Sequence, residues 1–186
     1  MSFPARAPRP IPKIETERLI LDAHQAGDLA DHAAIWADPE AMRHVLGSVS
    51  DLQTSWFRIL RHAGLWQVLG YGFWALREKA TGRYVGDIGF QDARRPLDPP
   101  LEPAPEAGWV LAPWSHGRGY ATEAMTAALG WLDAETAHRR SFCLIAPANL
   151  ASLRVAERLG YRSSGATKLN GEVSAILWRE KPDREA

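Results

Sequence analysis

One stretch of the sequence, from Gly108 to Leu132, constrains the fold more than any other. Residues 108–112 are mostly aromatic and aliphatic, as in a strand, and Gly117 and Gly119 follow shortly after them. Behind the glycines, apolar side chains recur at steps of three and four from Ala121 to Leu132, which is the spacing of an amphipathic helix. The stretch therefore predicts a strand, a glycine-containing turn and a helix in direct succession.

The turn and the start of this helix have the features of an anion-binding site. Glycines admit backbone conformations that other residues avoid and bring N–H groups close to a ligand. The first helical turn adds unpaired N–H groups and partial positive charge. His116 and Arg118 lie here, and no carboxylate occurs between Glu106 and Glu123. We expect a phosphate-type anion at this turn, although a plain strand-to-helix turn would also explain it.

Two familiar phosphate motifs are excluded at this turn. No Gly-Lys-Ser or Gly-Lys-Thr follows, so it is not a P-loop. Thr122 stands where a dinucleotide-binding fingerprint would have its third glycine.

Length and composition indicate one soluble domain. The chain has 186 residues, with 22 lysines plus arginines and 22 aspartates plus glutamates, so no net charge favours nucleic acid or a membrane surface. The single cysteine, Cys143, excludes an internal disulfide, and the six histidines have no metal-ligand spacing, so we expect no metal. Neither a signal peptide nor an apolar run long enough to span a bilayer is present, and we expect a cytoplasmic protein.

The chain order predicts a flexible proline-rich arm at residues 1–13 and a single domain at residues 14–181. Helices are expected at 28–36, at 52–62, from the glycine turn to 132, and from Asn149 to the Gly160 stop. Strands are expected at 18–23, 73–77, 84–90, 107–112, 142–146, 161–167 and 173–178, with a hairpin turn at Asn170-Gly171. This order predicts a mixed α/β sheet with helices on both faces.

Residues 92–105 contain five prolines and cannot join the interior of a sheet. We expect a long loop there. Such loops are often functional in compact domains, but a tolerated surface insertion explains the segment equally well.

Three separated motifs resemble one family. The glycine turn with Tyr120-Ala121-Thr122-Glu123-Ala124 is followed by Asn149-Leu150-Ala151-Ser152 and by Arg158-Leu159-Gly160-Tyr161, and Thr16-Glu17-Arg18-Leu19-Ile20-Leu21 lies near the start. Together they resemble the GNAT acetyltransferases, and within them the Rim-type ribosomal-protein N-acetyltransferases, over residues 14–180. The resemblance implies a mixed, mostly antiparallel central sheet, acetyl-CoA as donor, and direct acetyl transfer to a primary amine of a small molecule or a protein N-terminus in a ternary complex.

The resemblance also assigns roles to residues. It implies that the pyrophosphate binds the turn, made here by His116, Gly117, Arg118, Gly119, Tyr120, Ala121 and Thr122. The preceding strand splays from its neighbour in that family, so backbone N–H groups of Val110, Leu111 and Ala112 are expected to meet pantetheine and the thioester oxygen. Asn149 is expected to bind pantetheine, and Ser152 to contact the cofactor and protonate the leaving sulfur. Glu106 is expected to act as the base.

Each of these residues also has a structural explanation. Glu106 could be a solvated carboxylate at a strand end, and Asn149 and Ser152 could simply cap a helix. The sequence departs from the family at two positions: His116 begins the turn motif in place of Gln or Arg, and Ala156 stands where many relatives have a tyrosine acid. Cys143 lies within an apolar run and is expected to be buried rather than nucleophilic.

Three points stay open from the sequence. A non-catalytic CoA-binding module of the same fold would carry the same motifs, and a domain that binds another nucleotide phosphate would share the turn. The acceptor amine is unnamed, although Trp36, Trp56 and Trp74 are candidates to line its pocket. A homodimer is compatible with an exposed strand edge.

Overall fold

The computed structural model describes residues 9–45, 49–169 and 171–183. Eight strands form one sheet: β1 Ile14–Glu15, β2 Leu19–Asp22, β3 Phe73–Glu78, β4 Tyr84–Gln91, β5 Glu106–Leu111, β6 Arg140–Ile145, β7 Arg162–Leu169 and β8 Glu172–Glu180. Five α-helices accompany it: α1 Leu29–Trp36, α2 Pro39–Met42, α3 Leu52–Leu69, α4 Tyr120–Glu135 and α5 Leu150–Arg158. Short 3₁₀ turns lie at Ala26–Asp28 and Pro113–Ser115.

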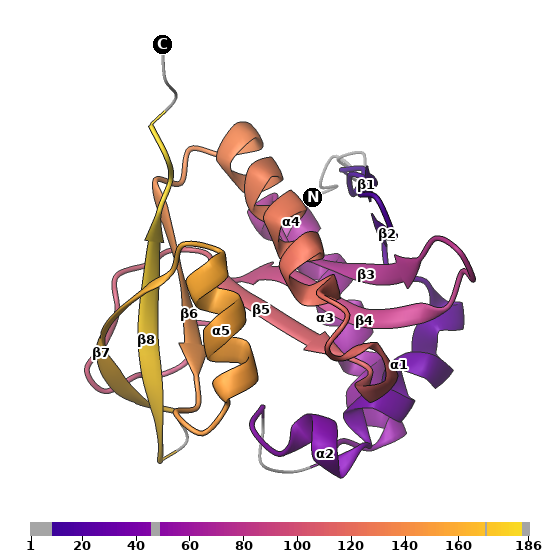
Figure 1. Cartoon of the computed structure of the whole chain (residues 1–186), viewed down its shortest axis with the longest axis horizontal. Coiled ribbons are helices and arrows are strands. Elements are labelled where there is room, and N and C mark those ends of the chain that lie inside the picture. Colours follow the sequence, from indigo (N-terminus) through magenta and orange to yellow (C-terminus); the bar gives the residue numbers. More distant parts are fainter. Residues whose placement is uncertain (1–8, 46–48, 170, 184–186) are drawn as a thin grey trace, which may run out of the picture.

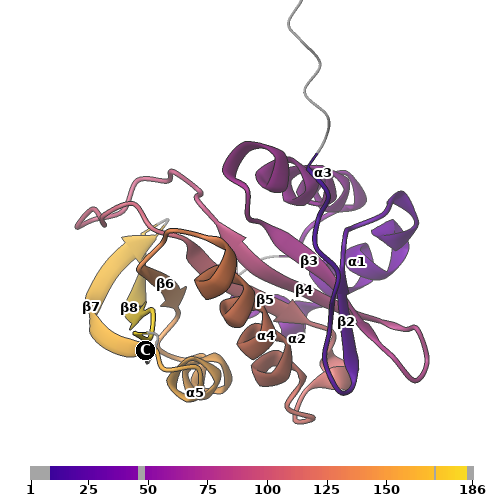
Figure 2. The ribbon, with the colours of Figure 1, turned by 90° about the horizontal axis from the view of Figure 1, so that it is seen from above.

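The sheet has the order β1-β2-β3-β4-β5-β6-β8-β7, and β5 and β6 are its one parallel pair (Figure 1). Helices α1 and α3 cover one face, and α4 and α5 cover the other (Figure 2). The predicted class, a mixed and mostly antiparallel sheet between helices, is confirmed. A crossover helix between parallel strands must pack on one face, which places α4 there.

The core lies between the sheet and its helices. Trp66 of α3, Trp74 of β3 and Trp131 of α4 pack edge to face, with ring centroids 4.6–5.4 Å apart. On the α4 side, Met125, Ala128 and Leu132 of the predicted apolar stripe are buried, while Ala121 is half-buried.

Glycines allow close approach of β4 to its neighbours. A Cβ on Gly86 would lie 2.1 Å from the Val110 carbonyl oxygen, and one on Gly89 would lie 2.2 Å from the Gly72 carbonyl oxygen. Since real Cβ atoms essentially never show such contacts, Gly86 allows β4 to pair with β5, and Gly89 allows it to pair with β3.

The N-terminal arm differs from its prediction where it is described. Gln67 of α3 exchanges two hydrogen bonds with the Arg9 backbone, at 2.8 and 2.9 Å. The Trp74 indole N–H donates to the Pro12 carbonyl oxygen at 2.8 Å. Residues 9–13 are therefore fastened to α3 and β3 rather than loose, and residues 1–8 lie outside the described part of the chain.

The other segments follow the predicted order. The β7–β8 hairpin forms with Leu169 opposite Glu172, although Asn170 itself lies outside the described residues. The proline-rich segment 92–105 has no helix or strand, and Asp98 makes one bridge to Lys168 of β7. None of the helices in the described ranges is both long and apolar enough to cross a membrane.

Candidate active site

The site begins where β5 and β6 part. The two strands share a single register pair, Glu106 with Phe142, and the Phe142 N–H donates to the Pro105 carbonyl oxygen at 3.0 Å. Beyond this point they separate, which agrees with the splay implied by the family resemblance. The outer part of β5 therefore presents one backbone edge to an opening instead of to a strand.

The direction of each β5 N–H follows from strand alternation. The Ala112 N–H donates to the Val85 carbonyl oxygen at 2.8 Å, which turns the even-numbered residues toward β4. The Pro105 carbonyl oxygen faces β6. By the same alternation, the backbone N–H groups of Trp109 and Leu111 face that side. The Leu111 N–H thus points to the open edge and stays a predicted donor, whereas the expectation needs correction for Val110 and Ala112, whose N–H groups point toward β4. Trp109 is the second donor on the open edge.

The glycine turn leads from β5 into α4 as the sequence predicts. Gly117 and Gly119 have φ of 74° and 79°, in the left-handed region, and Gly119 immediately precedes the first helical residue, Tyr120. No hydrogen bond outside the helix engages the N–H groups of residues 117–122 in the described part of the chain. These donors at the positive end of α4 fit an anionic group such as a pyrophosphate.

The side chains of the turn are mostly hydrogen-bonded to other parts of the protein and not directed at the anion site. The His116 Nε2–H donates to the Leu111 carbonyl oxygen at 3.0 Å, so Nδ1 of the neutral ring has no proton to donate. Arg118 Nη1 donates to Glu78 at 3.0 Å, and the Tyr120 hydroxyl donates to the same oxygen at 2.5 Å. The turn therefore offers its backbone, while His116 can donate a free N–H to phosphate only as an imidazolium.

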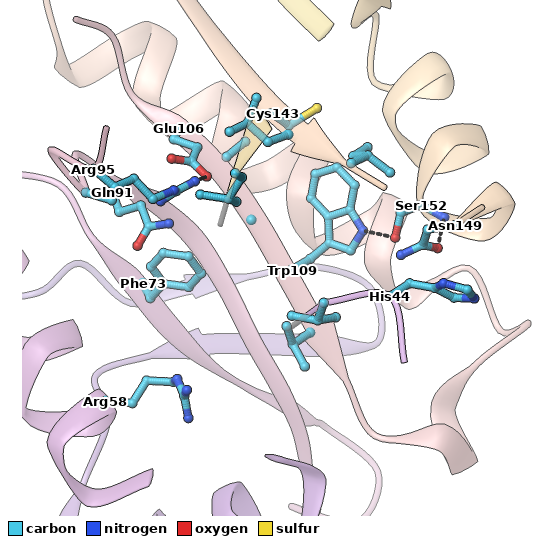
Figure 3. Close-up of a pocket in the computed structure, with 18 of the residues that line it drawn as sticks. His44, Arg58, Phe73, Gln91, Arg95, Glu106, Trp109, Cys143, Asn149 and Ser152 are labelled. Carbon is cyan, nitrogen blue, oxygen red and sulfur yellow. Dashed lines mark hydrogen bonds and ion pairs between the residues drawn. The ribbon is translucent and has the colours of Figure 1, made fainter. Parts of the chain in front are cut away.

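A pocket of about 390 Å³ occupies the opening. Its walls come from β5 and β6, from α1 and α3, and from the start of α5 (Figure 3). Trp36 lines it, whereas Trp56 and Trp74, the other proposed aromatic residues, do not. Trp74 belongs entirely to the core.

Glu106 stands at the closed end of the splay and is 8 % exposed. Arg95, from the proline-rich loop, donates to Glu106 Oε1. Oε2 has no hydrogen-bond partner among the described residues, so one carboxylate oxygen stays available to the pocket. The loop 92–105 thus contributes to the site directly, through Arg95.

Ser152 and Asn149 lie on the opposite wall, on the α5 side (Figure 3). Asn149 caps α5, its Oδ1 accepting the Ser152 N–H at 3.1 Å, which leaves its amide nitrogen free. The Trp109 indole N–H donates to Ser152 Oγ at 3.3 Å. Because that oxygen accepts a hydrogen bond, the hydroxyl hydrogen of Ser152 remains free to donate into the pocket.

Among the described residues, the pocket contains neither a tyrosine acid nor an exposed cysteine. All four tyrosines are described, and none of them lines it. Ala156, at the family's tyrosine position, is fully buried. Cys143 contributes to the pocket wall but is 1 % exposed, and burial raises the pKa of its thiol, which keeps the sulfur protonated.

A buried polar cluster that sequence spacing did not reveal lies behind the pocket. The Asp87 carboxylate accepts hydrogen bonds from His24 Nε2 at 2.7 Å, from Trp36 Nε1 at 3.0 Å and from the Tyr84 hydroxyl. His62, which lines the pocket, places Nδ1 3.4 Å from His24 Nε2. The candidate ligand atoms of His24, His62 and Asp87 all lie within 4.8 Å of one another. The fold brings these groups together from a loop, a helix and a strand.

Burial determines the charge states in this cluster. His32 belongs to the cluster too, with its Nε2 3.3 Å from Asp87 Oδ2. Burial lowers the pKa of His32 to about 4 and that of His62 well below its ordinary value. Burial alone would raise the pKa of Asp87, but the hydrogen bond from His24 and the neighbouring imidazoles outweigh it and hold that pKa below its ordinary value. The cluster therefore holds an ionised Asp87 carboxylate, and burial favours the neutral form of His32 and His62.

Comparisons with known proteins identify the family to which this fold belongs. The family model for the acetyltransferase (GNAT) domain matches residues 18–162. A solved structure of a Bordetella pertussis protein assigned to the GnaT acetyltransferase family is 31 % identical, covers 91 % of this chain and 99 % of its own, and has a TM-score of 0.79. An uncharacterized Bacillus subtilis protein, YkkB, is 30 % identical over 90 % of this chain and 95 % of its own.

The chain belongs to the GNAT acetyltransferase family and is an acetyl-CoA-dependent N-acetyltransferase. A ribosomal-protein-S5-alanine acetyltransferase from Vibrio fischeri is 19 % identical, covers 95 % of this chain and all of its own, and has a TM-score of 0.72. At that identity the likeness concerns the fold, which this chain therefore shares with the Rim-type enzymes.

Proposed function

We propose that the protein transfers an acetyl group directly from acetyl-CoA to a primary amine, with both substrates bound in one ternary complex. The observation that carries this proposal is the opening between β5 and β6, where free backbone donors, Glu106 and Ser152 surround one pocket. The amine belongs to a small molecule or to a protein N-terminus.

The chain's own residues fit the donor. The N–H groups of residues 117–122 suit the pyrophosphate, and the free edge of β5 suits pantetheine. The Asn149 amide nitrogen, at the start of α5, supplies a further donor. Acetyl-CoA brings an activated thioester. The protein must bind and orient the two substrates and transfer the protons.

Three proton and charge tasks are assigned to specific atoms. Glu106 Oε2 accepts the proton of the attacking amine, through water where direct contact is not reached. The Trp109 and Leu111 N–H groups stabilise negative charge that develops on the carbonyl oxygen. Ser152 holds a proton on Oγ for the departing thiolate, while the Trp109 indole fixes the position of that oxygen.

Two-substrate kinetics test the proposal. Initial rates of CoA release should give intersecting double-reciprocal lines when acetyl-CoA is varied against an amine chosen from amino acids, peptides with free N-termini and polyamines. Intact-mass spectra with acetyl-CoA alone should show no acetylated enzyme, and Cys143→Ala should retain most of the activity. Parallel lines together with an acetyl group trapped on Cys143 would instead establish a covalent intermediate.

A further inference from the structure

The pocket contains more cation than its one carboxylate balances. Arg58, Arg61 and Arg95 all line it, whereas Glu106 is its single acidic residue. Arg95 pairs with Glu106. Within the described residues neither Arg58 nor Arg61 forms an ion pair, and Glu185 is the one acidic side chain outside them. The α3 wall of the pocket is therefore positively charged.

Arg58 is the buried member of this pair. It is 8 % exposed, and its guanidinium stacks on the Trp36 ring at 3.5 Å. Its Nη2 makes one long hydrogen bond, 3.4 Å, to Ser50 Oγ, and its buried Nη1 has no partner in the described part of the chain. Stacking satisfies the face of a guanidinium but none of its in-plane N–H groups. Those donors remain available to a ligand.

The charges around Arg58 also indicate that its guanidinium lacks a counter-ion. Burial, with a smaller contribution from Arg61, lowers the pKa of Arg58 to about 10, while Asp87 opposes the shift. The Asp87 carboxylate is itself occupied by His24, Trp36 and Tyr84. A buried guanidinium without a counter-ion is costly, and an anion that entered the pocket would relieve that cost.

The place of Arg58 in the pocket indicates which substrate it meets. Arg58 lies on the α3 side of the pocket, across from Ser152 and Asn149 on the α5 side (Figure 3). The donor is proposed to enter along β5 and α5, so the α3 wall meets the acceptor. Building on the proposed function, we infer that the acceptor is an amine that also carries an anionic group, a carboxylate or a phosphate, held by Arg58 with help from Arg61. Guanidinium groups bind both kinds of anion through paired N–H donors.

Matched acceptor pairs test this inference. The carboxylates are glycine, β-alanine, 4-aminobutyrate and 6-aminohexanoate, each compared with its carboxamide, and O-phosphoethanolamine is compared with ethanolamine; spermidine is the cationic control. We expect the anionic member of at least one pair to have a KM about 10-fold or more below that of its neutral partner. The preferred pair distinguishes carboxylate from phosphate.

Variants connect the preference to the residue. Arg58→Met, which keeps the apolar stem, should reduce that KM ratio to near 1, and Arg58→Lys should restore part of it. Arg139→Met, which alters an exposed arginine paired with Asp183, should leave the ratio unchanged. Melting temperature and acetyl-CoA affinity of each variant report whether it is folded. Neutral amines or spermidine used as well as or better than the anionic acceptors would overturn the inference.

A binding measurement decides the case in which none of these acceptors reacts. Because the glycine turn also suits an anion, the titration uses Gly117→Val as the background: glutarate and inorganic phosphate should bind it saturably, and adding Arg58→Met should abolish that binding. Absence of binding, or equal binding to the double variant, would refute the role of Arg58. If acetyl-CoA itself fails to bind, the proposed function is refuted. The anion titration still tests the role of Arg58 in that case.

Discussion

Among single residues, Ser152 takes part in the cap of α5 through its backbone N–H and keeps its side chain free for chemistry. Its backbone N–H donates to Asn149 Oδ1 and its Oγ accepts from the Trp109 indole, so neither contact uses the hydroxyl hydrogen. Capping and catalysis are therefore compatible here. The sequence offered them as competing explanations.

Replacing Ser152 should separate its two roles. We expect Ser152→Ala to lower kcat about 10-fold, in the lower part of the range for positioned proton transfer, because a thiolate leaves moderately well unaided. The melting temperature should change little, since the cap oxygen belongs to Asn149. Trp109→Phe should give a smaller loss of kcat. Steady-state kinetics with thermal melts provide the readout, and an unchanged kcat in Ser152→Ala would assign the proton to another donor.

The sequence identified some site residues and missed others for a physical reason. Glu106, Asn149 and Ser152 were found because they adjoin motifs that are contiguous along the chain. Arg58 and Asp87 were missed because their meaning depends on partners from other elements, such as the Trp36 ring beneath Arg58. Trp109 could have been found, since alternation along β5 separates it from Val110 and Ala112.

Among the elements, the glycine turn can be tested as the anion site by a matched pair of glycine substitutions. Gly117 and Gly82 both have positive φ, 74° and 70°, and a Cβ on either would meet nothing within 4 Å. Valine at either position should therefore cost a similar strain, about 1–2 kcal/mol. Gly117→Val should weaken acetyl-CoA binding at least 10-fold, because distortion of the turn displaces its N–H donors, whereas Gly82→Val, in the β3–β4 turn, should not. Equal affinities in calorimetry would remove the turn from the anion site.

Element existence was easier to predict than element length. Helix α3 continues to Leu69 rather than ending near His62, because Gly64 is tolerated inside the helix and the left-handed Gly70 terminates it. Strand β1 has two residues and α2 has four, too few for any periodicity to register. Both owe their structure to neighbours, as when β1 pairs with β2.

At the scale of the whole molecule, the cluster behind the pocket should make stability depend on pH. His32 has a folded pKa of about 4 against an ordinary 6.5, so the unfolded chain binds more protons between these values. Its stabilising contribution is complete above about pH 6.5 and is lost as pH falls toward 4. His62 shifts in the same direction. Acidification therefore favours unfolding.

Denaturant unfolding at several pH values measures this effect. Between pH 7 and pH 4.5 the wild-type protein should lose on the order of 1–3 kcal/mol more than His32→Phe does. The comparison concerns slopes with pH, so a general loss of stability in the variant does not affect it. Identical slopes would mean that His32 is protonated in the folded protein as readily as in the unfolded chain.

Glu106, at the point where β5 and β6 part, is proposed to remove the proton from the acceptor amine. The most direct measurement is kcat as a function of pH from 6 to 9 for the wild-type enzyme and Glu106→Gln, with an amine that the enzyme turns over. We expect the variant to lose about 10²-fold or more in kcat across this range, with acetyl-CoA affinity little changed. Near full activity of Glu106→Gln across that range would contradict the claim and leave Glu106 as the structural partner of Arg95.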